Sequence, residues 1–398
     1  MQYGTVRLRR EEGEKQSVER GRGDAVLVAL TLTLLCFGLV MVFSASFPSA
    51  FYDLQGETGG NAAWYFLRQL CYALLGVGAM FVCSRIPLRL YERLAYPALA
   101  AAVLLLALVP VIGVKVNGAR RWISLGFTTF QPSEIAKLAV VLSFSKRMAE
   151  LGDRMATFRE GILPFALVLA LLAGLLVLEP HFSATVIIFA LSAVLLFVGG
   201  ARLGWFIGGG AVMAVGGTVA YLAFPYVQDR LSAWLDPFSD LTGDGWQVVQ
   251  SLYAIGSGGL SGLGLGRSRQ KYLYLPEEHN DFIFSVICEE LGFLGASIVL
   301  LLFALLIIRG YSIALRSDDR FAFLTAVGIT SLLAIQTLLN MAVCTNLLPC
   351  TGIALPFFSY GGTALLIQMA ESGIILSISR DLPGTPRLGA EIPRETEE

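Results

Sequence analysis

Charged residues are scarce in this sequence. Asp, Glu, Lys and Arg make up 15% of the 398 residues, whereas 55% are hydrophobic, and the mean hydropathy is +0.68. A water-soluble fold cannot hide so large an apolar share from solvent. The formal net charge is −1, so no overall excess of positive charge indicates a nucleic-acid partner. The composition predicts an integral membrane protein that does not bind nucleic acid.

The sequence also lacks the short motifs of several common site types. Its six cysteines form no CxxC pair and lie mostly in apolar runs, which is typical of small buried side chains. The glycine-rich stretch 256–266 matches neither GxxxxGK[ST] nor GxGxxG, and it follows no predicted strand. A nucleotide site is therefore excluded, and these glycines instead favour close packing of the backbone at the membrane surface.

Long apolar runs are abundant. A transmembrane helix needs about 20 mainly apolar residues, and the runs predict an all-α integral membrane protein with about ten such helices. The predicted spans are residues 24–46, 63–84, 94–112, 132–150, 161–179, 182–200, 203–224, 281–309, 321–346 and 360–380. Residues 1–23 and 381–398 are predicted to be tails that flank a membrane domain of residues 24–380.

The longest segment between two predicted spans is residues 225–280. Long loops in compact proteins are usually functional or disordered, and apolar residues argue against disorder here. Val227, Leu231 and Trp234 recur at helical spacing among polar neighbours, which predicts a short helix in the membrane interface.

Lys and Arg are distributed unequally between the two sides. Loops rich in these residues stay in the cytoplasm, and with the N-terminus inside, 20 fall on the cytoplasmic side and seven on the external side. Both termini are therefore predicted to be cytoplasmic. The external ones all lie in segments 113–131 and 225–280: Lys115, Arg120, Arg121, Arg230, Arg267, Arg269 and Lys271. A long loop escapes the charge rule, but Arg120 and Arg121 lie in a short loop and favour an anionic ligand outside the membrane.

Several ionisable residues lie inside or at the ends of predicted spans. Such residues are costly in a bilayer and are functional candidates. Glu134 and Lys137 are three residues apart and can meet on one helix face, so a functional role and a structural ion pair explain them equally well. Arg68, Glu179 and His181 lie near external ends of spans, and a structural role is the favoured interpretation for the last two.

Asp281 opens the eighth predicted span, directly after a polar stretch. A carboxylate at this position can cap the helix or complement its dipole. It also lies at the water boundary beside the basic external segments, where a general base can meet a polar substrate hydroxyl. The residues alone leave both roles open.

Four blocks of sequence are specific enough to compare with a known family. They read NGARRWISLGFTTFQPSEIAK at 117–137, GWQVVQSLYAIGSGGLSGLGLGRSRQK at 245–271, LPEEHNDFIFSVICEELG at 275–292 and LPCTGIALPFFSYGG at 348–362. These blocks resemble the SEDS family of peptidoglycan glycosyltransferases, which includes FtsW, RodA and SpoVE. The sequences VNGARRW and EPHFS look more like FtsW or SpoVE than RodA, and His181 replaces an aspartate of RodA-like members, so it receives no acidic role.

The resemblance implies an activity, partners and a location. Members polymerise lipid II, a polyprenyl-pyrophosphate-linked disaccharide pentapeptide, into glycan strands at the outer face of the bacterial cytoplasmic membrane. A class B penicillin-binding protein crosslinks the strands, and an FtsW-like member works with the division machinery at the septum. The reaction is an inverting transfer to a sugar 4-hydroxyl, and the lipid tail lies in a groove between spans.

The resemblance also implies roles for individual residues. The catalytic aspartate of the family maps to Asp281, which takes the acceptor proton or holds a divalent cation, Mg²⁺ or Mn²⁺. Arg120 and Arg121 neutralise the departing pyrophosphate, and the family ion pair maps to Glu134 and Lys137. The full predicted substrate-binding set is Arg68, Arg120, Arg121, Trp122, Glu179, Gln247, Lys271 and Ser359.

Other functions remain open at this point. A lipid II flippase also needs many spans and intramembrane charges, and Glu289, Glu290 and Glu371 lie deep enough to serve one. A flippase requires a polar route across the whole membrane, whereas most candidates here gather near the external face. A RodA-like elongation polymerase and a structural scaffold are further alternatives, and the scaffold fits only if an Asp281 substitution leaves synthesis intact.

Overall fold

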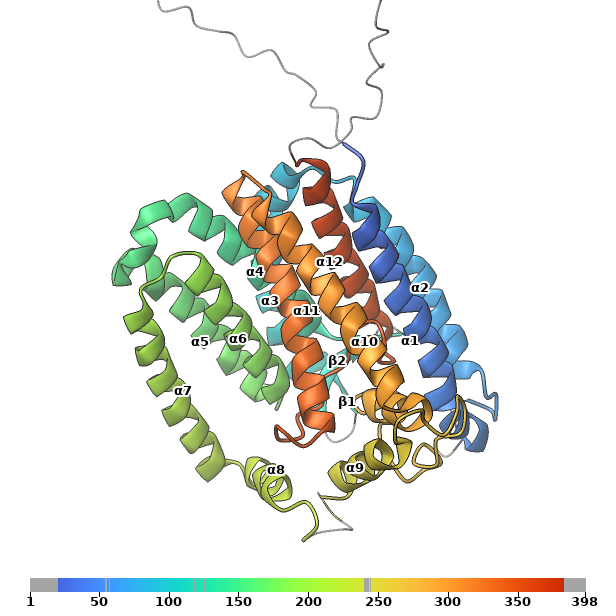
Figure 1. Ribbon diagram of the computed structural model, residues 1–398. Helices are drawn as coiled ribbons and strands as arrows, with labels where there is room; N and C mark the ends of the chain where they lie inside the picture. Colours follow the sequence, from blue (N-terminus) through green and yellow to red (C-terminus); the bar gives the residue numbers. More distant parts are fainter. Residues whose placement is uncertain are drawn as a thin grey trace, which may run out of the picture.

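The computed structural model describes residues 21–53, 56, 58–116, 119–124, 126, 128–239, 243 and 245–382. The predictions about residues 1–20 and 383–398, which form most of the two tails, lie outside the described residues. Long helices run side by side in one bundle (Figure 1).

The bundle contains a helix at each of the ten predicted ranges. These helices are α1 (Ala25–Tyr52), α2 (Trp64–Cys83), α3 (Leu88–Ile112), α4 (Pro132–Leu151), α5 (Leu163–Leu178), α6 (Phe182–Val198), α7 (Leu203–Ala223), α10 (Ile283–Leu315), α11 (Arg320–Cys344) and α12 (Gly362–Arg380). A 3₁₀ turn (Gly152–Ala156) and a π-helical turn (Phe158–Ile162) join α4 to α5. Two short helices, α8 (Pro225–Leu235) and α9 (Trp246–Gly258), follow α7.

Eight helices in the described residues are long and apolar enough to cross a membrane, when α5 is counted together with the π-helical turn before it as Phe158–Leu178. The two others at predicted ranges are α6, which has only 17 residues, and α4, which carries Glu134 and Lys137. Most residues of α4 are buried between its neighbours, so its polar groups face protein rather than lipid. The structure supports a multi-pass membrane protein, and ten crossings remain a prediction.

Local chemistry explains several helix starts. The Asp24 side chain accepts a hydrogen bond from the Leu27 amide at 2.8 Å, and Asp319 accepts one from the Ala322 amide at 2.7 Å, so both residues cap their helices. Pro132 begins α4, where its missing N–H costs no helical bond. The third helix begins at Leu88, whereas its span was predicted to begin at residue 94. The prediction missed the first turns because Arg89 and Arg93 lower their hydropathy.

The helices differ strongly in burial. α11 and α12 are the most enclosed of the candidate spans, and α12 packs along α2 while α10 packs along α11. By contrast, α7 is described in full and none of its residues is buried. In Figure 1, α7 stands at the edge of the bundle and leads directly into α8.

The segments that are predicted to be external cover one end of the bundle. In Figure 1, α8 and α9 lie opposite the end where α1 starts and α12 finishes. The helix predicted from the spacing of Val227, Leu231 and Trp234 is confirmed as α8. Residues 113–131, expected only as a loop, also form a small antiparallel sheet of β1 (Val114–Val116), β2 (Ala119–Ser124) and β3 (Thr129–Phe130) in the order β1-β2-β3.

The orientation of this bundle is open to a labelling test. We expect a cysteine at Asp236, in the segment after α8, to react with a membrane-impermeant maleimide in intact cells. A cysteine at Arg154, whose side chain is 64% exposed, should react only after permeabilisation, because Lys and Arg favour the cytoplasmic side. The background would carry Ser at Cys36 and Cys71, the two cysteines that are exposed. Labelling of Arg154→Cys from outside the cell would show that the topology is the reverse of the predicted one.

Candidate functional site

A large cavity of about 1380 Å³ opens at the end of the bundle that is predicted to be external. It is lined by residues from the starts of α2, α4, α6 and α12, from the sheet, and from the loops before α10 and α12. Six residues of the predicted catalytic and substrate-binding set line it: Arg68, Arg121, Trp122, Gln247, Asp281 and Ser359. Segments that are far apart in sequence therefore meet around one space.

Asp281 lies in the wall of this cavity and is partly exposed. Helix α10 begins at Ile283 with Phe282 as its N-cap residue, so Asp281 does not cap this helix and one of its two open roles loses support. The Asp281 backbone carbonyl accepts a hydrogen bond from the Asn340 side chain at 2.7 Å. A side chain at Gly352 would place its Cβ 3.0 Å from the Asp281 carboxylate, so the small residue leaves room for that carboxylate.

The surroundings of Asp281 change its acidity. Burial raises the pKa of Asp281 to about 6, and the nearby Glu277 carboxylate raises it further, whereas Arg230, Arg121 and His279 oppose the rise. At neutral pH the group is therefore mostly ionised but close to its titration point. A carboxylate in this state can accept a proton and release it again, as general base catalysis requires.

Arg120 and Arg121 point in different directions, as successive residues of a strand normally do, and β2 also contains a bulge at Arg121. Lys115 of β1 pairs with Arg120, and Val114 pairs with Trp122, so Arg121 is an extra residue between two paired positions. The Arg121 guanidinium lines the cavity and donates to the Pro180 carbonyl. The Arg120 guanidinium is exposed, donates to the Pro110 carbonyl at 3.1 Å, and is absent from the described lining. The predicted joint role of the two arginines is therefore not supported.

Other predicted residues contribute to the wall in different ways. The Arg68 guanidinium lies 4.6 Å from the centre of the Trp64 ring. The Ser359 hydroxyl donates to the Asn280 carbonyl at 2.7 Å and accepts from the Leu355 amide at 2.7 Å. Ser359 thus ties the loop before α12 to the residue that precedes Asp281.

Glu134 and Lys137 form an ion pair at 2.8 Å on α4, with side chains that are 13% and 3% exposed. Both residues line the cavity. The pair places two compensating charges at the inner part of the cavity wall, which agrees with the structural interpretation of this spacing and leaves a role toward a ligand untested.

Lys271 is not at the cavity. Its ammonium lies 2.7 Å from the Glu290 carboxylate, and the two side chains are 2% and 0% exposed. The Ser44 hydroxyl donates to the same carboxylate, at 2.8 and 2.6 Å to its two oxygens. The predicted contact of Lys271 with substrate is therefore not supported by this structure, because the charge of Lys271 is already paired inside the protein.

The glycine-rich loop before Lys271 is bound tightly to α10. The amides of Leu263 and Gly264 donate to the carbonyls of Glu289 and Glu290, both at 2.9 Å. Helix α10 bends at Gly292, whose φ is 66°, and a Cβ at Gly292 would lie 2.3 Å from the Gly262 nitrogen. The predicted close packing of these glycines is confirmed, and it anchors the segment that leads to Asp281.

Glu179 is also withdrawn from the cavity. It follows the last residue of α5, its side chain is 1% exposed, and it is not among the described residues that line the cavity. Its neighbours Pro180 and His181 do line it. The prediction that Glu179 contacts substrate directly is not supported by this placement.

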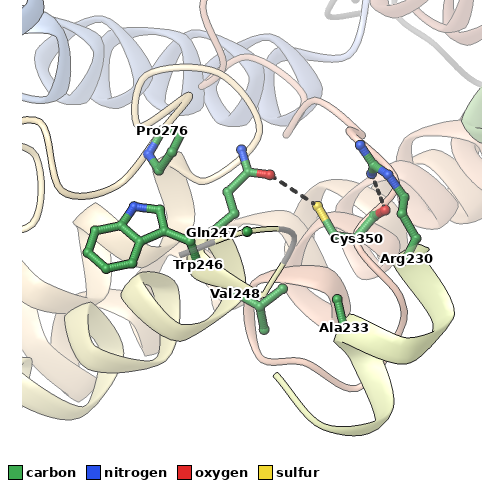
Figure 2. A pocket seen from close by; sticks show the side chains of 8 residues that line it. Arg230, Ala233, Trp246, Gln247, Val248, Pro276 and Cys350 are labelled. Carbon is green, nitrogen blue, oxygen red and sulfur yellow. Dashed lines mark hydrogen bonds between the residues drawn. The ribbon is translucent and has the colours of Figure 1, made fainter. Parts of the chain in front are cut away.

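A second, smaller pocket of about 220 Å³ adjoins the first (Figure 2). It lies between α8, the start of α9 and the loop at Cys350, and it shares Arg230, Gln247, Pro276 and Cys350 with the wall of the cavity. Figure 2 shows the Cys350 thiol directed at the Gln247 side-chain oxygen, 3.6 Å away, and Arg230 bonded to the Cys350 carbonyl. These contacts form the partition between the two spaces.

Arg230 lines the cavity but is not in the predicted site. The sequence places it among the basic residues predicted to be external, and the charge rule for long loops gives no reason to prefer it to Arg267 or Arg269. The structure places Arg230 on α8, in the walls of both spaces and within electrostatic reach of Asp281. The signal for its selection would have been its place in the predicted interfacial helix.

A resident metal ion has few protein ligands here. Among the described residues, no group of three or more His, Cys, Asp or Glu side chains could hold a metal ion. Mg²⁺ commonly binds through one or two carboxylates together with phosphate oxygens of a substrate. Asp281 fits that arrangement as a single carboxylate next to arginines that suit a phosphate group.

Comparison with known proteins gives a consistent result. The family model of cell cycle proteins that covers FtsW, RodA and SpoVE matches residues 24–383. A probable peptidoglycan glycosyltransferase FtsW of Trichlorobacter lovleyi is 42% identical over 372 residues, which is 92% of this chain and 96% of that protein. The stage V sporulation protein E of Bacillus subtilis is 40% identical over 361 residues, or 90% and 97% of the two chains.

Solved structures extend the similarity to the fold. A chain from a peptidoglycan synthase complex, studied for its coordination of polymerization and crosslinking, matches with a TM-score of 0.74 and 31% identity. It covers 90% of this chain and 98% of its own length. The rod shape determining protein RodA of Thermus thermophilus matches with a TM-score of 0.67 and 29% identity, covering 91% and 98% of the two chains.

Proposed function

Since this chain belongs to the FtsW, RodA and SpoVE family, we propose that it is a peptidoglycan glycosyltransferase that polymerises lipid II at the outer face of the cytoplasmic membrane. The observation that carries the proposal is the cavity in which Asp281 and Arg121 face one space at the external end of a membrane bundle. The space accepts a membrane-held donor and an aqueous sugar together. The identities of 42% to an FtsW and 40% to a sporulation protein support division or sporulation over cell elongation.

The proposed reaction is a single displacement with inversion. The 4-hydroxyl oxygen of the acceptor sugar attacks the anomeric carbon of the donor, and the bond from that carbon to the pyrophosphate oxygen breaks. The hydroxyl proton passes to the Asp281 carboxylate, and the bonding electrons leave with the polyprenyl pyrophosphate. Arg121 stabilises the charge that develops on this leaving group, because a charge-assisted hydrogen bond strengthens as the charge grows.

The shape of the cavity argues against a flippase. Among the described residues, those that line it come from the external halves of the helices, with Lys137, Gln336 and Gln368 among the deepest. A flippase needs a polar route through the whole membrane, and this cavity ends within its outer half. Glu289 and Glu290, once candidates for such a route, bind the loop before Asp281 instead.

The proposed function also implies a protein partner and a divalent cation. The similarity to a chain of a peptidoglycan synthase complex supports a class B penicillin-binding protein as the crosslinking partner, with the division machinery around both. A divalent cation would bind at Asp281 with pyrophosphate oxygens and would screen their charge. Purified protein with its partner should convert lipid II into glycan, and failure to form glycan would overturn the proposed function.

Arg120 and Arg121 provide a matched pair of variants, because only Arg121 is in the described lining of the cavity. We expect Arg121→Ala to lower kcat/KM for lipid II by about 10- to 100-fold, the usual range for a lost hydrogen bond to a charged group. Arg120→Ala, which removes an equal charge one residue away, should change it by less than about threefold, because that guanidinium faces away from the cavity. Initial rates over a range of lipid II concentrations would test this, and equal losses in both variants would contradict the assigned directions.

The raised pKa of Asp281 predicts an acid limit to activity. The carboxylate must be unprotonated to accept the acceptor proton, and burial raises its pKa to about 6. Activity should therefore be full between about pH 7 and pH 8 and fall about tenfold per pH unit below about 6. A profile of kcat/KM between pH 4.5 and 8 would measure this. Constant activity down to pH 4.5 would exclude Asp281 as the base.

A further inference from the structure

Glu179 is a buried carboxyl group with no hydrogen-bond partner in the part of the chain that the structure describes. Neither of its oxygens has one among the described residues, and the side chain is 1% exposed. A buried polar group normally finds a partner, and an exception calls for an explanation. Its position, just beyond α5 and behind the cavity wall, gives it access to protein groups but not to a ligand.

The charged neighbour of Glu179 is Arg121. Burial raises the pKa of Glu179 to about 8, and the Arg121 charge offsets only part of that rise. Two residues further on, burial lowers the pKa of His181 to about 3, with Arg121 and Lys137 acting in the same direction. At neutral pH, Glu179 is therefore protonated and His181 is neutral. Neither residue then offsets the positive charge of Arg121.

The positive charge of Arg121 acts on two carboxyl groups, and its guanidinium is bonded to the residue that follows Glu179. On the cavity side its charge acts on Asp281, and on the protein side it acts on Glu179. Its terminal nitrogen donates to the Pro180 carbonyl, whereas its Nε is buried and has no acceptor among the described residues. An ionised Glu179 offers that nitrogen an acceptor.

We infer that Glu179 is a positioning residue that controls, through Arg121, how tightly the donor pyrophosphate is held. With its carboxyl neutral, the Arg121 guanidinium faces the cavity and binds the pyrophosphate. With its carboxyl ionised, the guanidinium forms an ion pair away from the cavity and the pyrophosphate loses a cation. This inference rests on the proposed function, since it requires a pyrophosphate-linked donor at Arg121.

The inference predicts a specific alkaline effect on KM. For the wild-type protein with its partner, KM for lipid II should rise about tenfold per pH unit above 8, because each unit lowers the protonated fraction tenfold, while kcat changes little. Glu179→Gln keeps the size and neutrality of the protonated carboxyl, so its KM should stay constant up to pH 9.5. Glu179→Met, also unable to ionise, should behave in the same way and serves if the first variant folds poorly.

Glu160→Gln is the matched control. This carboxylate is 53% exposed and pairs with Arg154 on the loop between α4 and α5, so the variant should keep the wild-type rise in KM. A similar alkaline rise in Glu179→Gln, Glu179→Met and the wild type would overturn the inference while leaving the proposed function in place. Absence of polymer from the wild type at every pH would overturn the proposed function and the inference with it.

Discussion

Asp281→Asn should form almost no glycan while remaining folded and bound to its penicillin-binding partner. The amide keeps the size of the side chain but cannot accept the acceptor proton, and loss of a general base commonly costs about 10²- to 10⁴-fold in rate. Polymerisation of lipid II by the purified complex would measure the loss.

Stability should respond differently to the same change. Asp281 does not cap α10, and its raised pKa means that the folded surroundings disfavour the charged form. Replacing it with a neutral amide should therefore leave the midpoint of thermal unfolding unchanged or slightly higher. Asp229→Asn, which removes an exposed carboxylate from α8, is the control and should retain activity. Near-normal synthesis by Asp281→Asn would restore the structural interpretation of this residue.

Lys271→Met should destabilise the protein strongly. The Glu290 carboxylate is fully buried and takes its positive partner from Lys271 at 2.7 Å. Removing one member of a buried ion pair leaves an uncompensated charge and typically costs about 3–5 kcal/mol. Thermal unfolding of the purified protein in detergent would show a large drop in midpoint.

Two further variants separate this effect from a general sensitivity to substitution. Adding Glu290→Gln to Lys271→Met removes the stranded charge and should recover most of the lost stability. Arg154→Met breaks an ion pair whose members are 64% and 53% exposed, which should cost at most about 1 kcal/mol. If the double variant loses as much stability as Lys271→Met and Glu290→Gln lose together when each is made alone, the two side chains are not coupled.

The helices were readable from the sequence because span length is a local property. A run such as 203–224 contains its own signal, and the structure has α7 at Leu203–Ala223. The place of Asp281 beside basic external segments was also readable, since the blocks that contain Asp281 and Arg121 meet at one cavity. Local patterns and long shared blocks thus predicted the bundle and the centre of the candidate site.

What the sequence did not predict depends on partners that are distant in the chain. Lys271 looked available for a ligand, yet Ser44, which shares Glu290 with it, lies 227 residues away. The separation of Arg120 from Arg121 arises from strand pairing in a segment without strand-like alternation. Glu179 was predicted to face a ligand, but the protein packed around it leaves its side chain 1% exposed and outside the described lining of the cavity.

Because of the bulge in β2, the number of residues in this segment matters as well as their identity. One β1 step from Lys115 to Val114 corresponds to two β2 steps, from Arg120 to Trp122. Deleting Arg121, the one residue between these pairs, would restore even pairing but would remove the arginine that lines the cavity, since Arg120 is not in the described lining. Evolution and protein engineering can therefore exchange side chains here more readily than they can change the spacing between them.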